Sequence, residues 1–227
     1  MIEKSRNFKN KGWYFMNIDY LDLVKILKET YPDAKCSLDF TTPFELVVAV
    51  MLSAQCTDER VNKTTASIFP KYNTPADFAK IDINKLENLI HPCGFYKNKA
   101  KNLKACAKKL ILDYNGIVPN NMEQLLTLPG IGRKSANVIL LDAFGIAEGV
   151  AVDTHCKRIS NKIGLSLESD PEKIEQDLIK IFPKSTLKDI NHLFVWHGRY
   201  TCTARSPKCE FCKINKYCKS WNNSNKK

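Results

Sequence analysis

A glycine-rich turn between two predicted helices constrains the fold of this chain more than any other feature. The residues before Pro129 have a polar start and clustered apolar side chains that suit a short helix, which Pro129 ends. Gly130 and Gly132 allow a tight turn, and from Arg133 a second helix can run to Gly145. The sequence therefore predicts a helix, a hairpin and a second helix.

This hairpin has the properties of a phosphate-binding site. Backbone N–H groups of such a turn, and of the helix N-terminus that follows it, can point at an anion. Lys134 lies in the first turn of the second helix, where the helix dipole favours the neutral amine that a nucleophile requires. A solvated surface lysine fits the same position, so the turn alone leaves catalysis open.

The charge balance favours a polyanionic partner. The chain has 35 Lys and Arg residues against 24 Asp and Glu residues, which gives a formal net charge of +11. An excess of this size is typical of proteins that bind nucleic acid, although a merely basic protein also fits it. Two segments, 97–109 and 199–219, concentrate the basic residues and suggest two basic faces beside a groove.

The N-terminal segment 1–18 is a basic, polar extension with one short apolar run, too short for a signal sequence. No stretch of the chain approaches the length of a membrane span. We therefore expect a cytoplasmic, nucleoid-associated protein. In a reducing compartment its nine cysteines serve as thiols or metal ligands rather than disulfides.

Helical patterns continue through the rest of the chain. A capping box at 42–45 opens a helix that is apolar almost all round, as expected for the buried centre of a lobe. Asp58 and Asp170 are placed as N-caps of later helices, and Thr74-Pro75 starts another. Because no segment alternates as a strand does, the predicted fold class is all-α.

Four of the nine cysteines lie close together near the C-terminus. They are Cys202, Cys209, Cys212 and Cys218. Structural zinc usually takes two Cys-x-x-Cys knuckles, and this tail has one, so a 4Fe-4S cluster fits the spacing better than zinc. Arg205 and Lys208 lie between the first two cysteines, where contact with phosphates and simple solvation are both open. The other cysteines are scattered and are interpreted as packing thiols.

Three segments in this order resemble the endonuclease III family, bifunctional DNA glycosylases of the helix-hairpin-helix superfamily. They are the hairpin 128–137, the segment 152–155 and the four-cysteine tail. The likeness extends from about Asp19 to Cys218. The chain departs from the family pattern in its N-terminal extension, in Cys56, and in the aromatic Phe95 where an aliphatic residue is common.

The resemblance implies two helical lobes with double-stranded DNA in the cleft between them. A six-helix barrel with the helix-hairpin-helix would span 36–146. Segments 19–35 and 147–227 would form a discontinuous second lobe that carries the 4Fe-4S cluster. We expect a monomer in which Lys134 comes from one lobe and Asp153 from the other.

The implied function is base excision repair. Such enzymes remove oxidised pyrimidines from duplex DNA and cleave the abasic site by β-elimination through a lysine imine. Lys134 would attack the sugar, while Asp153 would stabilise the cationic character that develops there. Asp153 also stands where the N-cap of a helix belongs, and the two roles are compatible.

The resemblance also implies a set of DNA contacts. Gln55 and Phe95 would fill the space that the flipped nucleotide leaves, and the hairpin residues Gly130, Ile131 and Gly132 would contact the backbone. Gln55 as a helix end and Phe95 as a core residue are the structural alternatives.

Other functions are open at this point. An adenine-mismatch glycosylase of the same superfamily lacks a lysine at the position of Lys134 and has an acidic residue in the segment of Gln55. A noncatalytic DNA-binding module would use the hairpin and the cluster only as architecture. An iron-sulfur electron carrier would leave the basic segments unexplained.

Overall fold

The computed structural model describes residues 19–224, and the predicted N-terminal extension, 1–18, lies outside the described residues. The α-helices are α1 (Tyr20–Thr30), α2 (Pro43–Leu52), α3 (Asp58–Ile68), α4 (Pro75–Lys80), α5 (Ile83–Ile90), α6 (Tyr96–Tyr114), α7 (Met122–Leu126), α8 (Arg133–Phe144), α9 (Thr154–Ile163), α10 (Pro171–Ile181), α11 (Lys184–Tyr200) and α12 (Lys219–Ser224). Two 3-10 helices are η1 (His91–Cys93) and η2 (Asn215–Tyr217). No strand occurs between residues 19 and 224, which confirms the all-α fold class.

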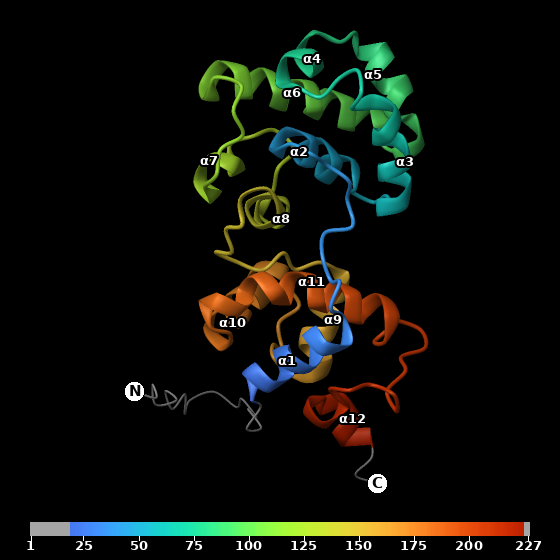
Figure 1. The fold of residues 1–227 in the computed structure, drawn as a ribbon, viewed down its shortest axis with the longest axis vertical. Coiled ribbons are helices and arrows are strands. Elements are labelled where there is room, and N and C mark those ends of the chain that lie inside the picture. The colour runs from blue at the N-terminus through green and yellow to red at the C-terminus, as the bar shows by residue number, and fades with distance from the viewer. Residues whose placement is uncertain (1–18, 225–227) are drawn as a thin grey trace.

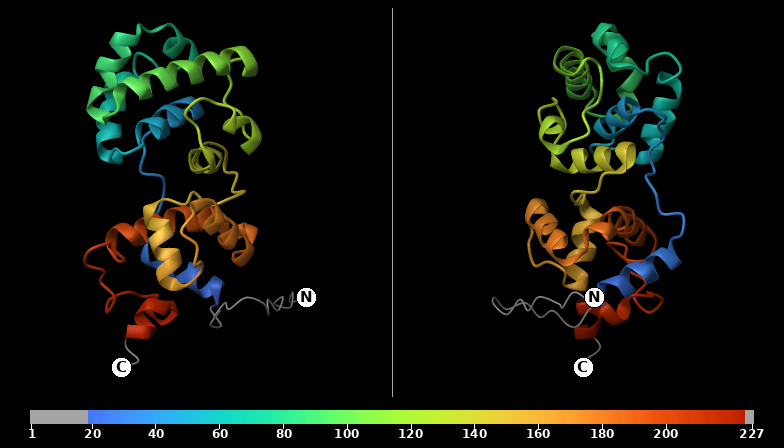
Figure 2. Two further views of the ribbon diagram at one scale, coloured as in Figure 1. Left: turned by 180° about the vertical axis from the view of Figure 1, so that it is seen from behind. Right: turned by 60° about the vertical axis from the view of Figure 1, so that its left-hand side comes forward.

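The described chain has two separate hydrophobic cores. Figure 1 shows the two groups of helices that surround them. We call the first the barrel lobe: it comprises α2 to α8, and its core runs from Leu38 to Leu140. We call the second the terminal lobe: it comprises α1 and α9 to α12, with core residues from 23–31 and 150–214. The chain passes between the lobes twice, before α2 and after α8 (Figure 2). We propose this division as the domain organisation, with the boundaries that the sequence suggests.

Helix α2 is the buried centre of the barrel lobe. Every residue from Phe44 to Leu52 is buried, and the helix packs against α6 and α8. Its start is set by the predicted capping box, in which Glu45 N–H donates to Thr42 Oγ1 at 3.1 Å and the Glu45 carboxylate accepts from Thr41 and Thr42. Burial of each large apolar side chain contributes about 1.5–3 kcal/mol, so α2 is a main source of stability for this lobe.

The N-terminal helix belongs to the terminal lobe. Leu23, Val24 and Leu27 of α1 are buried in its core, and α1 packs along α11. At the end of α1, the Tyr31 hydroxyl hydrogen-bonds to His197 Nδ1 at 3.1 Å and to Thr201 Oγ1 at 2.6 Å. The two ends of the described chain are therefore joined in one lobe.

The predicted N-cap of α3 was wrong by one residue. Thr57, not Asp58, caps the helix, since its hydroxyl accepts from Arg60 N–H at 3.3 Å. Asp58 is the first helical residue, and its carboxylate accepts a charged hydrogen bond from Arg199 of α11 at 2.5 Å. The Asp58 carboxylate therefore forms an ion pair with the other lobe instead of capping α3.

The sequence suggested that the lysines of segment 97–109 form one basic face. In the structure, not all lysines of α6 lie on the outer face of the helix. Lys99 is buried, and Lys104 is half-buried with its ammonium donating to the carbonyls of Ala79 and Ile81. Both side chains point toward the interior, because backbone carbonyls near the ends of neighbouring helices accept hydrogen bonds from their ammonium groups. The basic surface of this helix is therefore smaller than its composition indicates.

Within residues 19–224, three pairs of a carboxylate with an arginine or histidine side chain connect the lobes. Besides Arg199 with Asp58, His192 Nε2 lies 2.8 Å from Asp142 Oδ1, and Arg133 Nε lies 2.6 Å from Glu175 Oε2. The last two pairs join α8 to helices of the terminal lobe, so α8 is the barrel helix that is tied most directly across the interface.

In the described part of the chain, no helix is long and apolar enough to cross a membrane.

Candidate active site and thiol pocket

The hairpin after α7 is held in place by a glycine. Gly130 has φ +82°, in the region that side chains rarely adopt. A Cβ atom there would lie 2.7 Å from Met51 Cε and 3.1 Å from Asn102 Cβ, so both side chains would have to shift to admit one. Glycine therefore allows the turn to pack against α2 and α6.

The helix N-terminus that follows the hairpin is open. Gly132 is the N-cap of α8, and no side chain caps this end. The first N–H groups of a helix have no intrahelical acceptor, so they are available to an anion. The side chain of Ile131 is buried and its N–H donates to Leu128 O at 3.1 Å, and its contact with DNA stays a prediction.

Lys134 is exposed in the first turn of α8. The residues on either side of it are not free: Arg133 forms a two-pronged ion pair with Glu175, and Asn137 is buried. The helix turn that carries Lys134 is therefore pinned to the terminal lobe, while its amine faces solvent.

Asp153 is the N-cap of α9, as predicted. Its Oδ1 accepts from Cys156 N–H at 2.7 Å, and the residue is half-buried. Oδ2 has no hydrogen-bond partner among residues 19–224. One oxygen thus fixes the carboxylate in place, and the other is available to a ligand.

The segment that leads from α8 to Asp153 is held from both sides. On the barrel side, Asn137 Nδ2 donates to Val150 O at 3.4 Å. On the terminal side, Asn191 accepts from Ala151 N–H at 2.6 Å and donates to Gly149 O at 3.3 Å. These contacts fix the path of the chain into Asp153.

Gln55 and Phe95 share an uncommon backbone conformation. Their φ angles are 54° and 47°, and a non-glycine residue in this left-handed region costs on the order of 1 kcal/mol or more. Phe95 is also 64% exposed, although it is a large apolar residue. Such strain and exposure together are typical of a functional loop.

A cleft of about 240 Å³ in the barrel lobe brings these predicted positions together. Its lining includes Gln55, Phe95 and Gly130, together with Met51, Asn98, Lys99 and Asn102. Lys134 and Asp153 are not part of this lining. The cleft is therefore a separate hollow beside the hairpin, bordered by the two strained loops.

Lys99 is a residue of this region whose placement the sequence interpretation missed. Its ammonium donates to Leu52 O and Cys93 O, both at 2.8 Å. These carbonyls precede the loops of Gln55 and Phe95, so one side chain ties both loops, and burial lowers its pKa. Its helical spacing from the buried Leu103 and Cys106 could have revealed that Lys99 faces inward.

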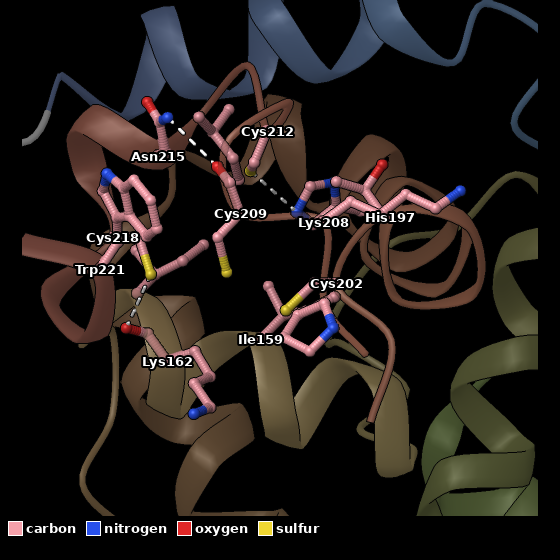
Figure 3. A pocket seen from close by; sticks show the side chains of 14 residues that line it. Ile159, Lys162, His197, Cys202, Lys208, Cys209, Cys212, Asn215, Cys218 and Trp221 are labelled. Atoms are coloured by element: carbon pink, nitrogen blue, oxygen red, sulfur yellow. Dashed lines mark hydrogen bonds between the residues drawn. The ribbon is translucent and has the colours of Figure 1, made fainter. Parts of the chain in front are cut away.

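The four C-terminal cysteines line one pocket, shown in Figure 3. Cys212 Sγ lies 3.7 Å from His197 Nε2, and Cys218 Sγ lies 3.4 Å from Lys162 O. Between residues 19 and 224, no three metal-binding side chains form a group that could hold a single ion. Each of the four irons of a 4Fe-4S cluster binds one thiolate, so the ligands surround a volume, as these four thiols do.

The loop that carries the first two of these cysteines is anchored to α9. Arg158 donates to Cys202 O through Nε at 3.0 Å and through Nη2 at 2.7 Å. Arg205 and Lys208 are exposed on the same loop, and their contact with DNA stays a prediction. The remaining five cysteines lie outside the pocket, three of them buried.

Comparison with known proteins gives consistent results. Residues 48–184 match the family model of the HhH-GPD superfamily base excision DNA repair proteins. The chain is 48% identical to endonuclease III of Synechocystis over 88% of this chain and 91% of the relative. It is 40% identical to endonuclease III of Escherichia coli over 87% of this chain and 93% of the relative.

Solved structures agree with this similarity. The structure of a non-covalent endonuclease III–DNA complex superposes with a TM-score of 0.85 at 40% identity, over 92% of this chain and 97% of that one. A trapped endonuclease III–DNA covalent intermediate also gives 0.85 at 40% identity, over 90% and 96% of the two chains.

Proposed function

The chain belongs to the HhH-GPD superfamily of base excision DNA repair proteins, as a DNA glycosylase and lyase of the endonuclease III type, and we propose that Lys134 and Asp153 carry its activity. The substrate is duplex DNA that contains an oxidised pyrimidine or an abasic site. The observation that carries the assignment is the exposed Lys134 amine in the first turn of the uncapped α8, directly after the hairpin.

Recognition begins with the phosphate backbone. The hairpin and the open N-terminus of α8 offer N–H groups to phosphate oxygens, which places the strand beside Lys134. The glycosidic carbon is out of reach inside a base stack, so the damaged nucleotide is flipped out. Gln55 and Phe95, both held in strained conformations at the edge of the cleft, then fill the space in the duplex.

Lys134 acts as the nucleophile. Its neutral amine forms a bond to C1′ of the flipped nucleotide, and the glycosidic bond breaks, so the base leaves with the bonding electrons and takes up a proton. Loss of the amine proton and opening of the sugar ring give an imine between Nζ and C1′. The imine acidifies the C2′ protons. Removal of one of them expels the 3′ phosphate by β-elimination, which nicks the strand.

Asp153 supports this chemistry by charge. The hydrogen bond from Cys156 N–H to Oδ1 fixes the orientation of the carboxylate. A carboxylate held in this way stabilises the positive charge that develops on the sugar as the base departs. Because Oδ2 has no partner in the described chain, it is the oxygen that can face the sugar or relay the proton of Lys134.

We propose that the thiol pocket holds a 4Fe-4S cluster, with Cys202, Cys209, Cys212 and Cys218 as its ligands. The cluster would pin the loop of Arg205 and Lys208, whose charges then meet phosphates in a fixed position. The test is the iron content and visible absorption of purified protein. Cys209→Ser should lose both, whereas Cys36→Ser, outside the pocket, should keep them. Equal iron content in the two variants would refute the ligand set.

We propose further that the enzyme acts as a monomer on DNA. The chain supplies both Lys134 and Asp153, so the site needs no residue from a second copy. Light scattering of the protein with and without a short duplex should give the mass of one chain in each species, and a dimer mass would contradict this.

Borohydride trapping tests the central assignment. Reduction converts the imine to a stable amine, so wild-type protein should form a covalent adduct with a duplex that carries an abasic site or thymine glycol. Lys134→Gln should form no adduct and no nick but still bind the duplex. Lys173→Gln, which removes an exposed lysine of α10, is the matched control and should form the adduct as wild type does. Nicking by purified Lys134→Gln would overturn the assignment.

A further inference from the structure

Glu175 is a buried carboxylate at the interface of the two lobes. It lies on α10 and is 2% exposed. Burying a charge is costly unless partners compensate, so the partners of Glu175 indicate what it is for. The three hydrogen bonds that it accepts from residues 19–224 all come from α8, the helix that carries Lys134.

These hydrogen bonds hold the first turns of α8. Arg133 donates to Oε2 through Nε at 2.6 Å and to Oε1 through Nη2 at 3.2 Å. Asn137, one turn later on the same face, donates to Oε1 at 2.8 Å. The arginine fork is a two-point contact, which fixes orientation as well as distance. Lys134 lies between these two anchored residues.

The same group of residues also contacts the segment that leads to Asp153. The amide nitrogen of Asn137 that donates to Glu175 also donates to Val150 O. Gly149 lies so close that a Cβ atom there would be 2.1 Å from Glu175 Oε1 and 2.7 Å from Asn137 Oδ1. No other residue fits at position 149 while the carboxylate and the amide keep their places.

We propose that Glu175 is a positioning residue for catalysis: it fixes the α8 turn of Lys134 and, through Asn137 and the contact at Gly149, the segment that ends at Asp153 in one arrangement. Glu175 touches neither the substrate nor the reacting atoms. This inference rests on the proposed roles of Lys134 and Asp153. A purely structural Glu175 would affect how much protein folds, but not how fast each folded molecule reacts.

Glu175→Gln is the variant that tests this role. Glutamine keeps the volume of the side chain but replaces one carboxylate oxygen by an NH₂ group. Because that NH₂ group would face the N–H donors of Arg133 or Asn137, the arrangement of these two residues is lost. Single-turnover cleavage of an abasic duplex, per folded molecule, should slow on the order of 10- to 100-fold. Binding of a duplex with an uncleavable abasic analogue should stay at the wild-type level. Glu172→Gln, an exposed acid on the same helix, controls for the lost charge and should react as wild type does.

A double-mutant cycle separates positioning from stability. If Glu175 fixes the position of Lys134 relative to Asp153, then adding Glu175→Gln to the Asp153→Asn variant should lower the cleavage rate only a little further. Additive losses would overturn the inference. Gly149→Ala displaces the Glu175 carboxylate and the Asn137 amide from the other side, and it serves as the test if Glu175→Gln fails to fold. This variant should also slow cleavage without weakening DNA binding. A wild-type cleavage rate would overturn the inference.

The controls keep this inference distinct from the proposed function. A wild-type protein that forms no borohydride adduct would refute the proposed function itself. A wild-type protein that forms the adduct, beside a Glu175→Gln variant that cleaves at the same rate, would refute only the role of Glu175.

Discussion

Asp153 Oδ1 accepts a hydrogen bond from the backbone N–H of Cys156 at 2.7 Å, so the carboxylate assigned to catalysis also starts α9. An aspartate in this place serves two purposes that substitutions can separate. Asparagine keeps an oxygen acceptor and loses the charge, whereas alanine loses both.

The first prediction uses this difference. Asp153→Asn should keep the stability of the wild type, because asparagine is as good an N-cap as aspartate, but should lose on the order of 100-fold or more in glycosylase rate. Asp153→Ala should lose the rate and also about 1 kcal/mol of unfolding free energy. Single-turnover kinetics and thermal unfolding measure the two effects. Wild-type activity of Asp153→Asn would show that capping is the only role of this residue.

The second prediction concerns Phe95, whose backbone lies in the left-handed region at φ 47°. Phe95→Gly should be more stable than Phe95→Ala by about 1 kcal/mol, because only glycine adopts this conformation without strain. Both variants lose the ring, so both should lose the fluorescence increase of 2-aminopurine placed opposite an abasic site. Unchanged fluorescence would show that Phe95 does not enter the duplex. Leu167→Ala, which removes an exposed apolar residue before α10, is the control.

The third prediction concerns salt. If DNA binding uses six or more phosphate contacts, affinity should fall about 10³-fold between about 50 and 200 mM salt. Arg205→Gln should reduce the slope of log K against log salt by about 1, as loss of one phosphate contact requires. Lys25→Gln, an exposed position on α1, should leave it unchanged. Fluorescence anisotropy with a labelled duplex measures the slope, and an identical slope for wild type and Arg205→Gln would contradict the contact.

The fourth prediction follows from the buried thiol of Cys106. Burial raises its pKa from 9.0 to about 12, so the folded protein holds this proton at pH values where the unfolded chain releases it. The resulting contribution to stability is fully present below about pH 9 and is lost as the pH rises toward 12. At 1.36 kcal/mol per pKa unit, the loss reaches about 4 kcal/mol.

Cys106→Ala removes this titration. The variant should be about 1 kcal/mol less stable than wild type at pH 7, because a small cavity replaces the sulfur. Its unfolding free energy should then fall less steeply than that of the wild type above pH 9. Denaturant unfolding at a series of pH values makes the comparison, in which all other titrating groups are shared. Parallel curves above pH 9 would refute the buried, protonated thiol.

Local patterns in the sequence predicted most of the helices correctly. The capping box at Thr42, the N-cap at Asp153 and the end of α8 at Gly145 depend on residues within one helical turn of each other, and all three are confirmed. The cap of α3 was assigned one residue late because Thr57 and Asp58 are both good N-caps. The carboxylate of Asp58 pairs with a residue far along the chain, which a local pattern does not show.

The candidate site depended on contacts over long sequence distances. The resemblance identified Lys134 and Asp153, whose roles stay predictions, but it did not reveal Glu175 or Asn191. Both are ordinary polar residues within amphipathic helices, and the partners that connect them to α8 and to the segment before Asp153 lie 38 to 42 positions away. The helical spacing of Lys99 indicates an inward side chain, but its acceptors could not be predicted, because they are backbone carbonyls, which every sequence offers at every position.

The pairing of Tyr31 with His197 and Thr201 has a consequence for synthesis on the ribosome. Translation produces α1 first, yet the surface on which it packs is made last. The barrel lobe is one continuous stretch and can fold as it emerges, while α1 remains an unattached leader with its apolar face uncovered. We therefore expect α1 to lack its packing partner until the final helices leave the exit tunnel.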